Sequence, residues 1–200
     1  MRVSNFHWLN SPAYLVCLRD ATERKRLLKQ LQYQAETDVL TSISNRRHFL
    51  EQASKEIARA IRQKHPLAIA VVDLDNLKQI NDTHGHALGD LVFKKFTIIC
   101  QNYIRTVDVF ARIGGDEFVL LLVETSADQA NQILERIRTA IMEQSLNSDG
   151  ISVSFTISAG ISSLENMSDS LDRLLSLADM ALYRAKQSGR NKVVIERNIV

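Results

Sequence analysis

Two apolar runs that flank a Gly-Gly pair constrain the fold of this 200-residue chain most strongly. The stretch from Phe110 to Val123 reads FARIGGDEFVLLLV. The glycine pair predicts a β-hairpin with a two-residue type I′ turn, because that turn needs positive φ at both central positions. Asp116 and Glu117 begin the second run, and acids beside a tight turn are usually just solvated. On this pattern alone, a purely structural role is the simpler interpretation.

A second pair of acids weakens that interpretation. Asp73 and Asp75 directly follow the apolar run Leu67–Val72, which is predicted to be a buried strand. If the two strands are neighbours, these carboxylates converge, and like charges about 4 Å apart repel by roughly 4 kcal/mol at an effective dielectric near 20. A divalent cation would turn the repulsion into coordination. Oxygen ligands without a His/Cys cluster favour Mg²⁺ or Mn²⁺ and indicate phosphoryl chemistry.

Composition argues against several classes of partner. The net charge of +2 provides no strong field for nucleic acid or for a membrane surface, so we expect neither as a partner. No apolar stretch approaches the roughly 20 residues that span a bilayer, and the first residues have no signal-peptide h-region. Cys17 and Cys100 lie in apolar runs without metal-ligand spacing, and we expect them to be reduced core thiols in a cytoplasmic protein.

Hydrophobic periodicity predicts an α/β (α+β) domain with a central mixed sheet flanked by helices. Asn45 is expected to cap a helix whose apolar positions are Phe49, Leu50, Ala53, Ile57 and Ile61. Further helices are predicted at 87–104, 127–145 and 170–187, and strands at 67–73, 107–113, 117–123, 151–157 and 193–195. The segment from residue 74 through Gly85 is expected to be a polar loop.

The residues before this domain have a different pattern. Two short strands are predicted at 3–9 and 13–19, around the turn-prone residues 10–12. Asp20 or Thr22 can cap a helix that runs to about Glu36, with Leu28, Leu31 and Ala35 on one stripe. This helix can pack on its own domain or pair with a second copy as a short coiled coil, and the sequence leaves both options open. The expected divisions are 1–19, 20–36 and 37–200.

Polar groups of many kinds follow the second acidic pair. Asn81 and Asp90 have the donors and acceptors to recognise a base edge, since a carboxylate accepts well from the N–H groups of guanine. The alternative is a hydrogen-bonded loop in which Asp82, Gly85 and Gly89 shape the turns. No Walker A loop, GxGxxG, HExxH or CxxC motif is present.

Four separated motifs together resemble the GGDEF family of diguanylate cyclases. They are DVLT with NRR over 38–47, DLDNLKQINDTHGHALGD over 73–90, RIGGDEF over 112–118, and ADMALYRAKQSGRN over 178–191. The resemblance covers about residues 36–195. It implies a fold like the palm of polymerases and nucleotide cyclases. It also implies that two GTP molecules condense into cyclic di-GMP with release of two pyrophosphates.

The resemblance assigns expected roles to individual residues. Asp73, Glu117 and the backbone carbonyl of Leu74 match metal ligands. Asp116 matches a position that serves as general base or as a further metal ligand, and the sequence does not separate these roles. Asn81 and Asp90 are expected to bind guanine. Leu77 and His86 are the other expected substrate-loop positions. The cations expected to contact the triphosphate are Lys78, Lys186 and Arg190. For the last two residues, an ordinary cationic helix C-terminus is the alternative.

Two regulatory features also follow from the resemblance. Arg105 and Asp108 match the RxxD inhibitory site that binds cyclic di-GMP, and arginine can hold phosphate or guanine through two bonds. Residues 13–26 resemble the end of a PAS sensor domain. We therefore expect a homodimer formed through residues 20–36 and an upstream sensor, because two GTP-loaded copies must meet.

The resemblance leaves the substrate and the activity open to alternatives. The acid at Asp90 implies selectivity for GTP, and the alternative is a promiscuous or adenine-using cyclase. The alternative function is a non-catalytic receptor for cyclic di-GMP or GTP, against which the intact GGDEF sequence argues. Departures from the family pattern are mild: residues 41–45 read TSISN where TGLPN is usual, and Leu77 replaces a common Phe.

Overall fold

The computed structural model describes residues 2–8, 11–17, 22–148, 150–166 and 169–196. The chain divides into two units, Met1–Ala35 and Glu36–Val200, and each is described by itself. None of the described helices combines the length and the apolar composition that a membrane crossing requires.

The first unit contains a β-hairpin and nearly all of one helix. Strand β1 (Arg2–Trp8) pairs antiparallel with β2 (Ser11–Cys17), and α1 spans Thr22–Glu36. The predicted strand limits, 3–9 and 13–19, were wrong at the turn, because Pro12 lies in β2 opposite His7. Both strands of a two-stranded sheet are edges, where a missing N–H is tolerated. The predicted helix end at Glu36 is confirmed, whereas residues 9–10, 18–21 and the side chains of Cys17 and Leu28 lie outside the described part.

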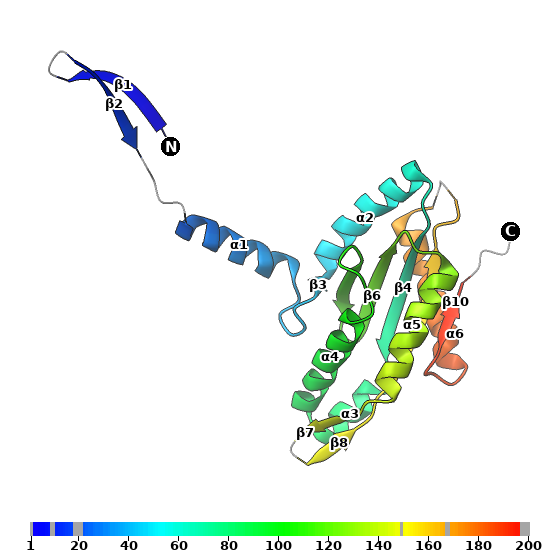
Figure 1. Ribbon diagram of the computed structural model, residues 1–200. Coiled ribbons are helices and arrows are strands. Elements are labelled where there is room, and N and C mark those ends of the chain that lie inside the picture. The colour runs from blue at the N-terminus through cyan, green and yellow to red at the C-terminus, as the bar shows by residue number, and fades with distance from the viewer. Residues whose placement is uncertain (1, 9–10, 18–21, 149, 167–168, 197–200) are drawn as a thin grey trace. The chain divides into compact units, whose positions relative to one another are not determined.

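The second unit is built on a mixed six-stranded sheet with the order β10-β9-β4-β6-β5-β3 (Figure 1). The outer pairs, β10 with β9 and β3 with β5, are parallel, and the inner pairs are antiparallel. The strands are β3 (Ser44–Asn45), β4 (Leu67–Leu74), β5 (Val109–Gly114), β6 (Glu117–Val123), β9 (Ile157–Ser163) and β10 (Val193–Ile195). This confirms the predicted mixed sheet and its edge strand at 193–195.

Helices cover both faces of this sheet. The helices are α2 (Arg46–Gln63), α3 (Leu77–His84), α4 (His86–Gln101), α5 (Ala127–Met142) and α6 (Leu171–Gln187). Alternate residues of β4 separate into two apolar clusters: Ala68, Ala70, Val72 and Leu74 pack with α4 and α5, and Leu67, Ile69 and Val71 pack with α2 and α6. A strand buried on both faces favours apolar residues at successive positions, which explains the uninterrupted apolar run Leu67–Val72 of β4.

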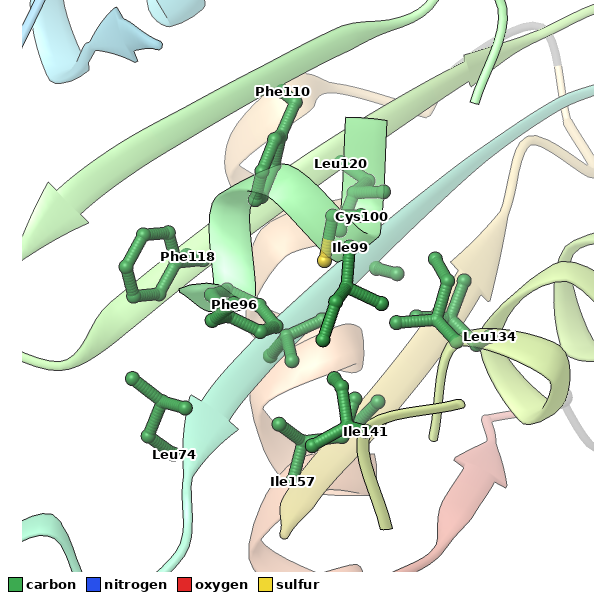
Figure 2. Packing of buried hydrophobic residues seen from close by; sticks show 14 of the residues in the cluster. Leu74, Phe96, Ile99, Cys100, Phe110, Phe118, Leu120, Leu134, Ile141 and Ile157 are labelled. Atoms are coloured by element: carbon green, nitrogen blue, oxygen red, sulfur yellow. The ribbon is translucent and has the colours of Figure 1, made fainter. Parts of the chain in front are cut away.

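Aromatic residues of three elements pack against one another within the α4–α5 cluster (Figure 2). Phe96 of α4 packs edge-on against Phe118 of β6 and Phe110 of β5, with ring centroids 4.7 and 5.8 Å apart. Cys100 is 1% exposed beside them, and burial raises the pKa of its thiol well above the usual value. The prediction of a core thiol is therefore confirmed for Cys100.

The predicted cap at Asn45 is confirmed, and two further helices begin at capping side chains that were not predicted from the sequence. Asn45 caps α2 by accepting a hydrogen bond from the backbone N–H of His48 at 3.0 Å. Ser126 and Gln129 form a capping box at α5, and Ser170 caps α6. Helix α4 ends three residues earlier than predicted, at Gln101, and α5 ends at Met142. The predicted core positions Leu50 and Leu91 are both 37% exposed.

The segment after β4 is helical, so the prediction of a polar loop through Gly85 was wrong. Asn76 adopts a left-handed φ of 56° and turns the chain at the end of the strand. Leu77 and Ile80, one helical turn apart, then pack against the core, and Leu77 is only 5% exposed. The polar residues of the segment occupy the other sides of α3, which hid the helical pattern. Gly85 ends α3 with a φ of 84°.

The hairpin is present, but its predicted type I′ turn was wrong. Gly114 pairs with Glu117, so the turn residues are Gly115 and Asp116, and neither glycine has positive φ. The register shifts between Arg112 and Gly114, which leaves one extra residue on β5 as a bulge. Arg112 donates from Nε and Nη2 to the Gly115 carbonyl oxygen at 2.9 and 2.7 Å. The turn therefore rests on these bonds and the bulge.

The single strand predicted at 151–157 is two separate features. Strand β8 (Ile151–Val153) forms a small hairpin with β7 (Leu146–Ser148), and β9 of the six-stranded sheet begins only at Ile157. The sequence of β9, ISAGISS, contains small residues with weak strand preference, which explains why alternation did not reveal it. Gly160 is needed there because α6 lies directly against the backbone of β9.

We predict that Gly160→Ala destabilises the domain by about 1 to 3 kcal/mol, the usual range for an overpacked core. A Cβ at this position would lie 2.1 Å from the Ala178 carbonyl oxygen and 2.2 Å from the Leu182 nitrogen, so α6 would have to move. Equilibrium unfolding in urea measures the change. Gly115→Ala is the control, because a Cβ there meets nothing within 4 Å. Equal midpoints for the two variants would contradict this account of β9.

Candidate active site

The two predicted acidic positions meet at one end of the sheet. Asp73 near the end of β4 lies directly opposite Glu117 at the start of β6. Directly opposed residues of an antiparallel pair have Cα atoms about 4.5 to 5.5 Å apart, with side chains on the same face. The parity of β4 places both side chains on the face covered by α2 and α6. The structure therefore brings Asp73 and Glu117 together, as predicted.

A cation from α6 reaches this pair. Lys186 Nζ lies 2.7 Å from Asp73 Oδ2, and the Asp73 residue is 6% exposed. Burial raises the pKa of Asp73, the bond and charge of Lys186 lower it, and the carboxylates of Asp116 and Asp75 raise it again. The net pKa lies above the usual value. Additional positive charge next to Asp73 would therefore stabilise the ionised form of its carboxylate.

Sequence reasoning missed a further carboxylate, Asp179 on α6. Its pKa is raised by burial and by repulsion from Glu117, and Lys186 offsets part of that rise. Asp179 precedes Lys186 by seven residues, which places the two on one helix face. That spacing, within the motif at 178–191, was the signal available in the sequence.

Arg112 holds the turn that carries Asp116. Besides its two bonds to the Gly115 carbonyl, its guanidinium lies 4.2 Å from the centre of the Phe93 ring and 3.4 Å from Asp38 Oδ1. Burial raises the pKa of Asp38, but hydrogen bonds from Thr41 and the charge of Arg112 outweigh it and leave the pKa below its usual value. The opening motif at 38–41 is thus tied to the GGDEF turn through one side chain.

The predicted guanine readers lie on neighbouring helices. Asn81 of α3 packs against Gly89 of α4: its Oδ1 would be only 1.9 Å from a Cβ on that glycine. Asp90, the next residue, is exposed. Asn81 Oδ1 is buried and has no hydrogen-bond partner among the described residues. An unsatisfied buried acceptor favours a donor from a ligand.

The other predicted substrate positions differ in exposure. Leu77 is buried in the core and Leu74 is 1% exposed, so Leu74 can offer only its backbone carbonyl. Lys78 and His86 are exposed at the first turns of α3 and α4. Arg190 is exposed in the turn after α6, with a left-handed φ of 60°. The roles assigned to these residues stay predictions.

The RxxD residues lie at the other end of the β5–β6 hairpin. Arg105 donates from Nε and Nη2 to the Asp108 carboxylate, at 3.2 and 3.0 Å, and from Nη2 to Thr125 Oγ1 and the Val123 carbonyl. Asp108 also accepts from the Val123 backbone N–H at 3.1 Å, and its side chain is 1% exposed. The hydrogen bonds to Asp108 and the negative charges of Asp108 and Glu124 raise the pKa of Arg105, although burial lowers it in part. The pair therefore also stabilises the hairpin.

The donor set fits Mg²⁺ or Mn²⁺. No cluster of three or more His, Cys, Asp or Glu side chains suited to a metal occurs among the described residues. Magnesium, however, is usually held by one or two carboxylates together with substrate phosphates rather than by an all-protein cage. The adjacent carboxylates of Asp73 and Glu117 match that pattern. Asp73, Glu117 and the Leu74 carbonyl would hold the ion.

We predict that Lys186→Met raises the pKa of Asp73 further, because burial and the neighbouring carboxylates are then unopposed. The side-chain carboxyl carbon shift of Asp73, followed against pH by NMR in metal-free protein, measures the change. Lys192→Met is the matched control, since Lys192 donates to the Ser188 carbonyl instead. An unchanged Asp73 titration in Lys186→Met would contradict the ion pair.

Diguanylate cyclases are among the similar sequences. Diguanylate cyclase A of Treponema denticola is 38% identical over 172 residues, which is 84% of this chain and 46% of that protein. Diguanylate cyclase DgcP of Pseudomonas aeruginosa is 38% identical over 177 residues, 88% of this chain and 26% of that protein. The chain thus spans about half or less of the length of these relatives.

Solved structures share the fold. The coiled coil and GGDEF domain of DgcB from Caulobacter crescentus, in complex with c-di-GMP, matches with a TM-score of 0.82 and 29% identity, covering 88% of this chain and 94% of that one. Diguanylate cyclase SiaD of Pseudomonas aeruginosa, in complex with its activator SiaC, matches with a TM-score of 0.78 and 33% identity, covering 86% of this chain and 66% of that one. The family profile described as "Diguanylate cyclase, GGDEF domain" matches residues 35–192. The chain therefore belongs to the GGDEF family of diguanylate cyclase domains.

Proposed function

We propose that this chain condenses two GTP molecules into cyclic di-GMP and releases two pyrophosphates. The single observation that carries the proposal is the direct opposition of Asp73 and Glu117, with Lys186 2.7 Å from Asp73. Two carboxylates and a lysine at the end of a sheet suit metal-assisted phosphoryl transfer. Family membership and diguanylate cyclase relatives support the same reaction.

The proposed roles follow from the chemistry of each group. A bound Mg²⁺ or Mn²⁺ would supply positive charge to the triphosphate. Asn81 and Asp90 bind the guanine edge, and Asp90 accepts from its N–H groups, which favours GTP over ATP. Lys186 and Arg190, with Lys78, stabilise the negative charge that develops on the departing pyrophosphate. Asp116, exposed in the turn, accepts the proton of the attacking 3′-hydroxyl or serves as a further metal ligand.

Two copies are needed for the complete reaction. The product contains two equivalent phosphodiester bonds, and one catalytic domain presents one GTP, so two domains must face each other. We propose that α1 brings them together as a short coiled coil. Leu27 and Leu31 are 53% and 61% exposed, and are four residues apart on one helix face. The related DgcB structure contains a coiled coil with its GGDEF domain.

The remaining proposals concern domain organisation, regulation and cellular location. Residues 1–19 would be the last strands of a PAS-like sensor domain, and residues 20–36 the helix that transmits its state to the catalytic domain at 37–200. Arg105 and Asp108 would bind cyclic di-GMP as an inhibitor, which requires Arg105 to exchange some of its present bonds for ligand contacts. Use of GTP would place the domain in the cytoplasm.

We predict that the chain releases pyrophosphate from GTP in the presence of Mg²⁺, and that Asp73→Ala and Glu117→Gln each lower the rate by at least about 100-fold. Pyrophosphate release and nucleotide chromatography measure the two products. Glu51→Gln is the matched control, because it changes an exposed carboxylate of α2 that pairs with Lys55. Binding of cyclic di-GMP without pyrophosphate release would instead favour a non-catalytic receptor.

We predict that a chain starting at Asp38 is at least about tenfold slower than the whole chain at equal low concentration, because α1 no longer raises the local concentration of the second copy. The two rates should converge as concentration rises. Leu31→Asp in the whole chain should act like the truncation, and Lys29→Asp should not. Equal rates for both lengths at low concentration would refute dimerisation through α1.

We predict that Arg105→Ala keeps the initial rate and relieves inhibition by added cyclic di-GMP, because Arg105 lies at the end of the hairpin away from Glu117. Initial rates over a range of cyclic di-GMP concentrations measure the effect. Arg59→Ala on α2 serves as the arginine control. Unchanged inhibition in Arg105→Ala would remove the proposed regulatory site.

A further inference from the structure

Asp75 resembles a second metal ligand in sequence, but its oxygens are already engaged. The residue is 3% exposed. Its Oδ1 accepts from Ser158 Oγ at 2.7 Å, and its Oδ2 accepts from Thr156 Oγ1 at 2.7 Å and from the Asn191 backbone N–H at 3.0 Å. A buried carboxylate with donors on both oxygens is suited to hold structure rather than to bind a cation.

The turn that Asp75 holds has an unusual backbone. Gly189, Arg190 and Asn191 have φ values of 106°, 60° and 48°. Positive φ at a residue such as arginine costs of order 1 kcal/mol or more, and it persists only where the surroundings fix it. Strained backbone of this kind is concentrated at active sites and ligand-binding turns.

Several contacts fix the turn in place. The Arg190 N–H donates to the Ala185 carbonyl at 3.1 Å, and the Asn191 N–H donates to Asp75. The Asn191 side chain accepts from Arg138 Nη1 of α5 at 3.1 Å and approaches Met142 Sδ at 3.4 Å. Asn191 therefore connects the end of α6 to both α5 and the segment after β4.

The segment from Lys186 to Asn191 is thus attached at both of its ends. The two residues that hold it, Asp73 and Asp75, lie two positions apart at the end of β4. Lys186 pairs with Asp73, and Asn191 binds Asp75. Arg190 lies between these points and is exposed. Because both ends of the segment are held, the path of the backbone at Arg190 is fixed relative to the carboxylates.

We propose that Asp75 and Asn191 form a clamp that positions Arg190 toward the triphosphate, an inference that rests on the function proposed above. Asp75 is then a positioning residue that acts through the turn, and Asp73 alone of the two acids is a metal ligand. The clamp affects the phosphate end of the nucleotide, whereas the guanine end depends on α3 and α4.

The test compares the affinities of GTP and GMP for the whole chain in Mg²⁺, by calorimetry. Asp75→Ala should lower the affinity for GTP about tenfold, which corresponds to roughly 1.4 kcal/mol of binding free energy. The affinity for GMP should stay within about threefold of the wild-type value. Asp75→Asn should retain GTP binding within about threefold, because its amide oxygen can keep the Thr156 and Asn191 bonds while its NH₂ donates to Ser158. Asp169→Ala is the matched control: this 4% exposed carboxylate also accepts backbone N–H groups, from Glu165 and Asn166, and should not change the GTP/GMP ratio.

A double-mutant cycle distinguishes positioning from general damage. In an Arg190→Ala background, Asp75→Ala should lower GTP affinity only slightly further. In an Asn81→Ala background, it should lower GTP affinity by the same factor as in the wild type. If Asp75→Ala does not fold, Asn191→Ala serves in its place, with the same selective loss of GTP affinity expected. Equal loss of GTP and GMP, or additive effects with Arg190→Ala, would overturn the clamp.

The wild-type chain separates failure of the clamp from failure of the proposed function. If it prefers GTP to GMP and the clamp variants keep that preference, the clamp alone is wrong. If the wild type binds the two nucleotides equally and releases no pyrophosphate, the proposed function fails and this inference fails with it.

Discussion

The antiparallel pairing of β4 with β6 is the constraint on which the candidate site depends. Its register places Asp73 opposite Glu117, and a slip of one residue would move one of the two side chains to the opposite face. The register is fixed by apolar burial, since alternate residues of β4 fill two different clusters. The same packing that stabilises the sheet therefore keeps two like charges adjacent at its end. Burial and the charges of Asp116 and Asp75 raise the pKa of Asp73, and Lys186 at 2.7 Å offsets part of that rise.

Helix α6 completes the site because β9 lets it approach closely. Gly160 removes the side chain that would collide with the backbone near Ala178 and Leu182, and the last turn of α6 then delivers Lys186 to Asp73. Arg112 has a comparable role on the other side of the hairpin, where it joins the GGDEF turn to Asp38 and to Phe93. The acidic pair is thus surrounded by elements whose positions depend on one glycine and one arginine.

Sequence patterns predicted most of this arrangement where one physical preference dominated. Long amphipathic helices, the cap at Asn45 and the apolar strand β4 all appeared, and the acids at the ends of two strands converged as expected. The predictions of local structure were wrong where tertiary contacts overrode the local conformational preference of the residues. Strand β9 is rich in small residues because α6 needs the space, and the turn at Gly115 is held by Arg112 instead of by positive φ. The hydrogen bonds of Asp75 and the proximity of Asp179 to Glu117 depend on segments far apart in sequence. The local spacing of Asp179 and Lys186 places these two residues on one helix face, but it does not reveal that Glu117 lies nearby.

The central claim is that Asp73 and Glu117 share a divalent cation that binds a nucleoside triphosphate. Electron paramagnetic resonance of Mn²⁺ tests it most directly, because free and bound Mn²⁺ can be counted in the presence of a non-hydrolysable GTP analogue without any turnover. We expect one nucleotide-dependent Mn²⁺ site per chain, lost in Asp73→Ala and in Glu117→Gln but retained in Glu51→Gln. Mn²⁺ binding that is unchanged by both active-site substitutions would contradict the account.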